Sequence, residues 1–131
     1  MAVFVARVRV VLLAVSILLF SGCAAHITPA DLREKIESGN APTIVDVRSR
    51  AEYDAGHVPG AIHLPFWSLA ANLDELPSQA ETGPVVLYCE HGPRAGLARA
   101  QIWFAETGPV FFLEGHMKAW RKAGMPMSTE D

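Results

Sequence analysis

Cys89 ends a short apolar run, Val85–Tyr88, and is followed by a tight loop that contains glycine and proline. Arg94 then precedes an amphipathic segment, 95–107, whose pattern predicts a helix. This order places a thiol at the carboxyl end of a buried strand, close to a helix N-terminus and to a guanidinium group. Loop N–H groups, the helix dipole and a fixed cation each stabilise a thiolate. The pattern therefore favours a cysteine that acts as a nucleophile or helps to bind an anion over one that only packs.

The segments that would position this thiol alternate between strand and helix patterns. We expect strands over 43–47, 61–64, 85–88 and 110–113, with 24–27 as a short tether or a first strand, and helices over 28–38, 49–56, 68–76, 95–107 and 116–123. Such alternation predicts an α/β fold with a central parallel sheet of about five strands and helices on both faces. Ligands of such sheets bind beyond the carboxyl ends of the strands, where Cys89 and the segment after Val47 both lie.

Two helix starts carry capping signals. Thr28 precedes Pro29 and Asp31, and Ser49 with Glu52 repeats the capping-box pattern. The tail, 128–131, is expected to be frayed. The apolar residues expected in the core or on a pocket wall are Leu97, Ile102, Phe104, Trp67, Trp103 and Trp120.

The N-terminus has the pattern of an export signal. Arg7 and Arg9 precede an apolar run, 10–20, and small residues follow at 21–24. The run is shorter than the roughly 20 apolar residues of a membrane-spanning helix. The segment Leu19–Cys23 resembles a bacterial lipobox, in which the cysteine receives lipid and becomes the mature N-terminus. We therefore expect a signal peptide over 1–22, a lipid-anchored tether over 23–27 and one domain over 28–131.

This leader predicts a lipoprotein on the periplasmic side of a bacterial membrane. Ala24 stands where an aspartate usually signals retention at the inner membrane, so the resemblance favours the outer membrane. An uncleaved signal anchor and a plain secretory signal are the alternatives. Cys23 and Cys89 are the only cysteines, and we expect no disulfide because Cys23 belongs to the leader region. The lack of a Cys-x-x-Cys motif argues against a dithiol oxidoreductase.

The charge balance argues against nucleic acid as a partner. The chain of 131 residues, enough for one domain, carries 11 basic and 14 acidic residues. Cleavage of the leader would remove Arg7 and Arg9 and no acidic residue, which makes the remainder more acidic. A mildly acidic domain without a basic stripe is not typical of nucleic-acid binding.

Four ordered signatures resemble those of the rhodanese sulfurtransferase family, over about Ile27 to Met127. They are Asp46-Val47-Arg48; Glu52 with Gly56-His57-Val58-Pro59-Gly60-Ala61-Ile62; Cys89-x-x-Gly92-x-Arg94; and Leu113-Glu114-Gly115 with Ala119-Trp120 and Gly124-Met125-Pro126. One such motif alone would be weak, but four in the family's order are specific. The resemblance implies a rhodanese-like fold.

The resemblance also implies an enzyme that works through a persulfide on Cys89, without a cofactor or a metal. Cys89 would take a sulfane sulfur from a small anionic donor such as thiosulfate and pass it to an acceptor such as cyanide or a thiol. Loop N–H groups would converge on the sulfur, and the planar fork of Arg94 would clamp the sulfonate oxygens. The expected substrate-binding residues are Glu90, His91, Gly92, Pro93, Arg94 and Ala95. The five histidines show no metal-ligand spacing.

Several residues near Cys89 depart from the family's usual pattern. Glu90 would oppose ionisation of the thiol if it pointed inward, and we expect it to face solvent. Pro93 removes one loop N–H, and Ala95 stands where many members have serine. His116 replaces the second glycine of a Gly-Gly pair, in a loop that borders the pocket, and we expect it to narrow or charge that pocket. Trp67 is expected at the pocket rim.

Asp46, Arg48, Glu52 and His57 are interpreted as structural support. We expect Asp46 to accept hydrogen bonds from loop amides and Arg48 to pair with an acid such as Glu52. His57 lies in a turn rich in glycine and proline and should shape it. His91, although it lies inside the Cys89 loop, is expected to face solvent.

Three other functions stay open on the sequence alone. A persulfide carrier or binding module without turnover would share every motif. A thiol-based phosphatase or arsenate reductase would have a loop one residue longer than the four residues between Cys89 and Arg94, and the shorter loop suits a single extra sulfur atom. A purely structural domain would hold Cys89 as a packed residue, whose thiol would react slowly at mildly acidic pH.

Overall fold

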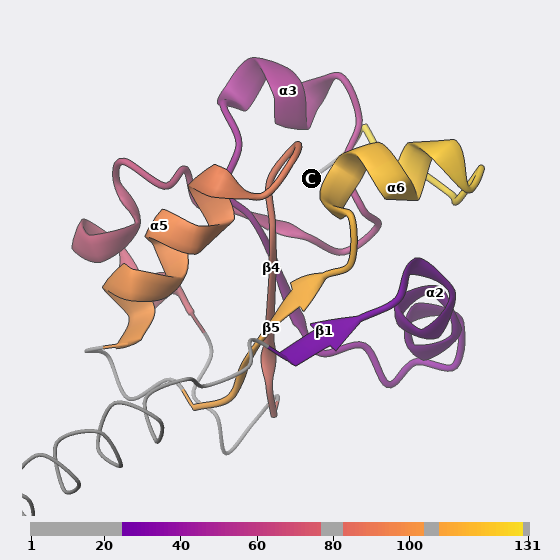
Figure 1. Ribbon diagram of the computed structural model, residues 1–131, viewed down its shortest axis with the longest axis horizontal. Coiled ribbons are helices and arrows are strands. Elements are labelled where there is room, and N and C mark those ends of the chain that lie inside the picture. Colours follow the sequence, from indigo (N-terminus) through magenta and orange to yellow (C-terminus); the bar gives the residue numbers. More distant parts are fainter. Residues whose placement is uncertain (1–24, 77–82, 104–107, 130–131) are drawn as a thin grey trace, which may run out of the picture.

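A computed structural model describes residues 25–76, 83–103 and 108–129. Its centre is a five-stranded parallel sheet in the order β1-β5-β4-β2-β3. Figure 1 shows α5 on one side of β4 and β5, and α2 and α6 on the other. The strands are β1 Ala25–Ile27, β2 Thr43–Asp46, β3 Ile62–His63, β4 Val85–Tyr88 and β5 Val110–Leu113. This arrangement confirms the predicted α/β fold. Residues 25–27 pair with β5, so this part of the segment 23–27, expected as a tether, belongs to the sheet.

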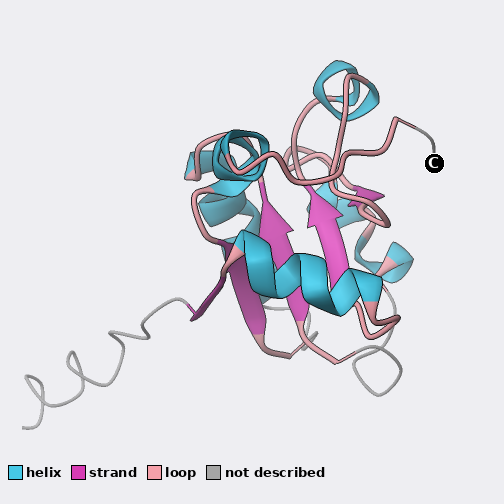
Figure 2. Ribbon diagram, turned by 90° about the vertical axis from the view of Figure 1, so that its right-hand side faces the viewer, coloured by secondary structure: helices cyan, strands magenta, loops and turns pink. Residues whose placement is uncertain are grey.

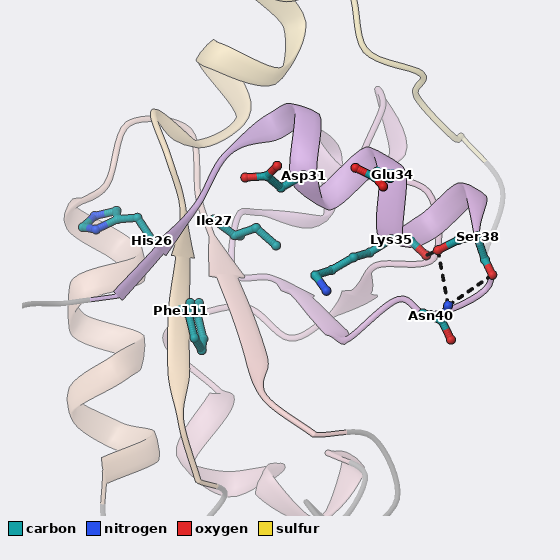
Figure 3. Close-up of a pocket in the computed structure, with 8 residues that line it drawn as sticks. All are labelled: His26, Ile27, Asp31, Glu34, Lys35, Ser38, Asn40 and Phe111. Atoms are coloured by element: carbon teal, nitrogen blue, oxygen red, sulfur yellow. Dashed lines mark hydrogen bonds between the residues drawn. The ribbon is translucent and has the colours of Figure 1, made fainter.

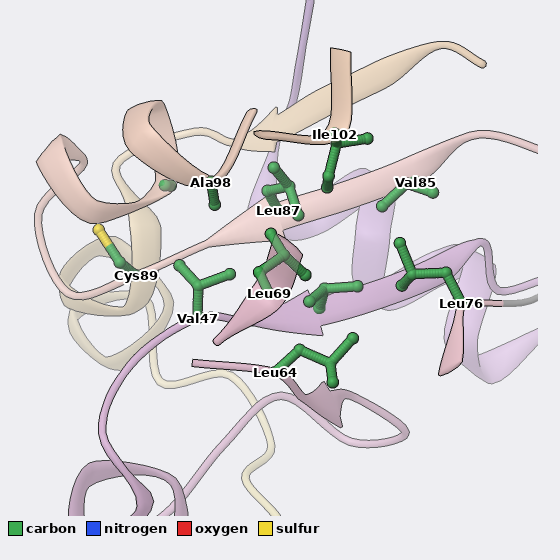
Figure 4. Packing of buried hydrophobic residues seen from close by; sticks show 11 residues of the cluster. Val47, Leu64, Leu69, Leu76, Val85, Leu87, Cys89, Ala98 and Ile102 are labelled. Atoms are coloured by element: carbon green, nitrogen blue, oxygen red, sulfur yellow. The ribbon is translucent and has the colours of Figure 1, made fainter. Parts of the chain in front are cut away.

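Helices cover both faces of the sheet (Figure 2). The α-helices are α2 Pro29–Glu37, α3 Arg50–Asp54, α5 Pro93–Ile102 and α6 His116–Lys122, and two 3-10 helices, η1 Leu69–Ala71 and η2 Leu73–Glu75, follow β3. Successive residues of a strand point to opposite faces, so Leu87 packs under α5 and η1, while Val86 packs under α2 and α6. Figure 4 shows the first of these two clusters, which includes Cys89.

The predicted helix caps are present. The Thr28 side chain accepts a hydrogen bond from the Asp31 N–H, and Ser49 and Glu52 form a reciprocal capping box. The helix predicted over 95–107 begins earlier, at Pro93, because the fixed backbone angle of proline suits the first helical position. Its expected end lies outside the described residues.

The segment 68–76, predicted as one helix, is instead two 3-10 turns. The side-chain amide of Asn72 donates to the Ser68 carbonyl at 2.7 Å, the carbonyl that the Asn72 N–H would use in an α-helix. The Asn72 N–H donates to Leu69 instead. Asparagine competes for backbone partners in this way, and here it interrupts the helix.

The expected core residues divide into buried and exposed ones. Trp120 is fully buried and donates its Nε1–H to the Pro126 carbonyl at 2.7 Å, and Ile102 is also buried. Trp67, Trp103 and Leu97 are 62%, 68% and 56% exposed, so none of them lies in the core. The alternative of a pocket wall for the two tryptophans stays a prediction. For Leu97 the reason is the helix period: α5 buries the face that carries Ala95, Ala98 and Ile102. Phe104 lies outside the described residues.

Ser128 is not frayed, as the sequence had suggested. Its N–H and carbonyl exchange two hydrogen bonds of 2.9 Å with the backbone of His57, in an isolated antiparallel bridge. The C-terminal segment is therefore tied to the loop that follows α3. Across the described ranges, no helix has the length and hydrophobicity needed to traverse a membrane.

Candidate active site

Cys89 follows β4 at the carboxyl edge of the sheet, with its sulfur directed toward the start of α5 (Figure 4). The residue is fully buried. The Gly92 N–H donates to Sγ at 3.0 Å, which closes a tight turn between the strand and the helix. Gly92 has a φ of +129°, a value that side chains with a Cβ rarely adopt, so this turn requires glycine.

The surroundings of Cys89 favour the thiolate. Burial raises the pKa of the thiol, but hydrogen bonds from the His116 side chain and from the backbone N–H groups of Ala95, Gly92 and His91 outweigh burial. The net effect lowers the pKa to about 7. A substantial share of the thiol is therefore ionised near neutral pH, which is the state that attacks electrophiles.

The guanidinium fork of Arg94 pairs with the carboxylate of Glu52. Its Nη1 and Nη2 donate to Oε2 and Oε1 of Glu52 at 2.6 and 2.8 Å. The Ser49 N–H and hydroxyl donate to the same Oε2. The hydrogen bonds from Arg94 hold the pKa of the Glu52 carboxyl well below its usual range. This bidentate pair joins the start of α5 to the start of α3.

Arg48 pairs with Asp46 and not with Glu52, which corrects the sequence prediction. Its Nε donates to Oδ1 of Asp46 at 3.0 Å and its Nη2 to Oδ2 at 2.7 Å, and Nη2 also donates to the Gly56 carbonyl at 2.8 Å. Asp46 also accepts from the Arg48 backbone N–H, as expected of a residue that binds loop amides. The reason for the correction is local: the capping box turns Glu52 toward Ser49, where Arg94 meets it.

Tyr88, which the sequence analysis did not single out, completes this buried network. Its hydroxyl donates to Asp46 Oδ2 at 2.8 Å and accepts the Val58 N–H at 3.1 Å. Burial, followed by the negative charge of Asp46, raises the pKa of the Tyr88 hydroxyl well above its usual range. The sequence feature that indicates this role is the single hydroxyl group at the end of an otherwise aliphatic strand, one residue before Cys89.

Glu90 does not face solvent freely, contrary to expectation. Its side chain is 17% exposed and pairs with Arg48 Nη1 at 3.4 Å and with Arg121 of α6. Two guanidinium groups therefore balance the carboxylate that stands next to Cys89. Arg121 was not predicted at the site; its signal was a basic residue in the last turn of the helix that follows β5.

The remaining predicted residues take varied positions. His91 and Pro93 are exposed, and Ala95 is fully buried at the start of α5. His57 is buried, stacks on the Tyr53 ring at 3.7 Å and bonds the Tyr53 carbonyl through Nδ1 at 2.9 Å, which fits a structural role. Trp67 packs edge-on against Phe66.

His116 lies directly against Cys89. Its Nδ1 accepts the Cys89 backbone N–H at 3.2 Å. A Cβ placed on Gly92 would come within 3.2 Å of His116 Nε2, so the imidazole covers the loop closely. That His116 narrows or charges a pocket at Cys89 stays a prediction.

A separate hollow of about 460 Å³ lies between α2 and the β1–β5 side of the sheet (Figure 3). Its lining residues are His26, Ile27, Asp31, Glu34, Lys35, Ser38, Asn40 and Phe111. None of these residues belongs to the Cys89 loop, so this hollow is distinct from the nucleophile.

Comparisons with known proteins agree with the geometry. The Rhodanese-like domain family matches residues 28–123. An HTH-type transcriptional regulator from Mycobacterium tuberculosis is 39% identical over 103 residues, which are 77% of this chain and 43% of the regulator. A sulfurtransferase from Allochromatium vinosum is 30% identical over 102 residues, which are 78% of this chain and 92% of that protein.

A solved thiosulfate sulfurtransferase from Pseudomonas aeruginosa has a TM-score of 0.66 and 28% identity, over 80% of this chain and 19% of that one. Several of the curated relatives are longer, and the chain spans about half of their length or less. The family match covers most of the chain and includes strands β2 to β5, the Cys89 loop and all of α6. The chain therefore belongs to the rhodanese-like domain family.

Proposed function

We propose that this protein moves a sulfane sulfur from thiosulfate, or a similar small anion, to cyanide or a thiol through a persulfide on Cys89. The observation that carries the proposal is a buried thiol with a pKa of about 7, held in a loop whose N–H groups converge on the sulfur. The sulfurtransferase from Allochromatium vinosum, matched over most of its length, supports the same chemistry.

Each half-reaction exchanges one sulfur–sulfur bond. The Cys89 thiolate attacks the outer sulfur of thiosulfate, a new S–S bond forms, and sulfite leaves with the electron pair of the broken bond. Cyanide then attacks the outer sulfur of the persulfide, and the electron pair of that S–S bond returns to Cys89 as thiolate. The atoms and charges balance without a cofactor.

The chain supplies positioning and charge stabilisation for both steps. The N–H groups of His91, Gly92 and Ala95 face the thiolate, and the same donors can stabilise the anionic outer sulfur of a persulfide. Arg94 acts through Glu52, by fixing where the loop and α5 begin. In this proposal the loop amides, rather than the Arg94 fork, hold the anionic donor.

The test is a thiosulfate:cyanide sulfurtransfer assay on the full chain purified in detergent, with Cys89→Ser as the matched control. Intact mass is measured after treatment with thiosulfate. We expect thiocyanate formation and one added sulfur atom in the wild type, and neither in the variant. Added sulfur without turnover would replace this proposal with a carrier that needs a specific acceptor. Release of phosphate from an aryl phosphate, without any sulfur transfer, would contradict it outright.

We also propose that Cys23 carries a lipid anchor on the periplasmic side of a bacterial membrane. The support is the leader sequence, in which small residues and Cys23 follow a basic and then an apolar segment. Labelled palmitate should enter the wild type and be absent from Cys23→Ala, and the variant should leave the membrane fraction. A variant that stays in the membrane fraction would indicate a signal anchor instead.

A further inference from the structure

His116 occupies a backbone position that favours glycine. Its φ is +55°, and across residues 25–76, 83–103 and 108–129 every other residue with a positive φ is glycine. A residue with a Cβ costs free energy in this left-handed region, and such strain persists at sites where the side chain has a use. The family resemblance places glycine here, so a histidine at this position calls for a compensating contact.

The compensating contact is with Cys89. The first turn of α6 holds both backbone groups of that residue: His116 Nδ1 accepts the Cys89 N–H at 3.2 Å, and the Met117 N–H donates to the Cys89 carbonyl at 3.0 Å. The backbone N–H of Cys89 is always a donor, so Nδ1 must present its lone pair. The neutral imidazole then carries its hydrogen on Nε2.

Nε2 lies against the loop that contains Cys89. It is the His116 atom closest to a Cβ built on Gly92, at 3.2 Å, and the Gly92 N–H is itself 3.0 Å from Sγ. The ring also lies tilted against the Phe112 ring, with 6.0 Å between ring centroids. An N–H donor is thus held beside the loop amides that face the thiolate.

The charged groups around Cys89 are paired with one another, and Arg94 also interacts electrostatically with the thiolate. Arg94 of α5 is paired with Glu52 of α3, Arg48 with Asp46, and Glu90 with Arg48 and Arg121 of α6. His91 is exposed. Among the contributions that lower the pKa of Cys89 against the opposing effect of burial, the hydrogen bond from His116 is the largest.

We propose that His116 is a positioning residue for sulfur transfer, which fixes Cys89 through Nδ1 and offers the N–H of Nε2 to the thiolate and to the outer sulfur of the persulfide. The inferred effect of His116 on turnover rests on the proposed function. Its effect on the thiol does not, because the reactivity of Cys89 toward an alkylating agent can be measured without a sulfur donor.

The experiment compares His116→Gly and His116→Asn in the full chain, on a Cys23→Ser background so that Cys89 is the only thiol. Glycine relieves the backbone strain and removes both ring contacts. Asparagine tolerates the left-handed region and can accept the Cys89 N–H through its side-chain oxygen, but it has no atom at the place of Nε2. His26→Asn is the matched control, since His26 also contacts the Phe112 ring but lies on β1.

Three quantities are measured: iodoacetamide alkylation against pH, urea unfolding, and thiosulfate:cyanide turnover. We expect His116→Gly to unfold at an equal or higher urea concentration while the alkylation midpoint rises by about one pH unit and kcat falls about tenfold. His116→Asn should recover part of kcat, and His26→Asn should match the parent.

Two results would overturn the inference. An alkylation profile that His116→Gly leaves unchanged would show that the imidazole does not act on the thiol. A joint loss of stability and reactivity in that variant would show a structural role only. If the parent lacks turnover, the proposed function fails, but the alkylation profiles still decide the role of His116.

Discussion

The loop that carries Cys89 is held by different chemistry on its two sides. Toward α3 the contact is an ion pair between Arg94 and Glu52, whose side chains are 28% and 34% exposed. Toward α6 the N–H and carbonyl of Cys89 itself form hydrogen bonds with uncharged groups, and the next residue, Glu90, pairs with Arg121. The ion pair fixes where α5 begins, whereas the uncharged contacts lie next to the sulfur. The start of α5 is therefore fixed from the α3 side, whereas the acidity of the thiol depends on His116 of α6 together with the N–H groups of the loop and of Ala95.

The buried network of Asp46, Arg48 and Tyr88 lies beneath both sides of the Cys89 loop. A substitution that breaks this network should therefore lower the free energy of unfolding more than a substitution in the loop or on either side of it. Asp46→Ala leaves the Arg48 guanidinium, which is 2% exposed, without its main partner. We expect the free energy of unfolding in urea to fall by about 3–5 kcal/mol. The matched control is Arg33→Ala in the exposed pair with Glu37, which should change it by less than about 0.5 kcal/mol. A small effect of Asp46→Ala would mean that Glu90 alone can satisfy Arg48.

Gly92→Ala tests the point where the two sides meet. Alanine would be strained at a φ of +129°, and its Cβ would lie 3.2 Å from His116 Nε2. We expect a loss of about 1–3 kcal/mol in urea unfolding, together with slower alkylation of Cys89 at pH 7. Gly96→Ala is the control on the same helix, in open space, and should stabilise the protein by about 0.5–1 kcal/mol. Normal alkylation in Gly92→Ala would show that the loop can shift without disturbing the thiol.

The ion-pair side is tested by a double-mutant cycle of Arg94→Ala and Glu52→Ala. Because both side chains are partly exposed, solvent weakens the attraction, and we expect a coupling free energy of about 1 kcal/mol in urea unfolding. The alkylation midpoint of Cys89 should move less in this cycle than in His116→Gly. A larger shift of the alkylation midpoint in this cycle would show that the ion pair affects the acidity of the thiol more than His116 does.

The same pair predicts a pH effect. The pKa of Glu52 is lower in the folded state than in the unfolded chain, where it is about 4.3. Its stabilising contribution is therefore complete above that value and is lost as the pH falls through the lower folded value. Urea unfolding of the wild type should weaken below about pH 4, and Glu52→Gln should weaken less over that range. Equal slopes would show that other carboxylates dominate acid unfolding.

Much of the fold was predictable because its signals are local. Capping at Thr28 and Ser49 depends on residues three positions apart, and the strand before Cys89 depends on a short apolar run. Where the prediction of 68–76 was wrong, the cause was the Asn72 side chain, whose choice of partner the apolar pattern does not reveal.

The pairing of charges was not predictable in the same way. Glu52 and Arg94 are 42 residues apart in the chain, as are Arg48 and Glu90, and only the packing of α3 against the start of α5 decides which acid meets which arginine. The exposure of Leu97 likewise depends on which face of α5 meets the sheet. The contact of His116 with Cys89 depends on how closely α6 approaches the end of β4.

The parallel direction of the strands determines how a lipid anchor at Cys23 would orient the domain relative to a membrane. β1 begins at Ala25 on the amino edge of the sheet, and Cys89 follows β4 at the carboxyl edge. One residue separates Ala25 from Cys23 in the sequence. A lipid on Cys23 would thus hold the domain close to the bilayer by the amino edge of its sheet. The strands rise by about 3.3 Å per residue, so their length would separate the thiol from the lipid surface and turn it toward soluble partners.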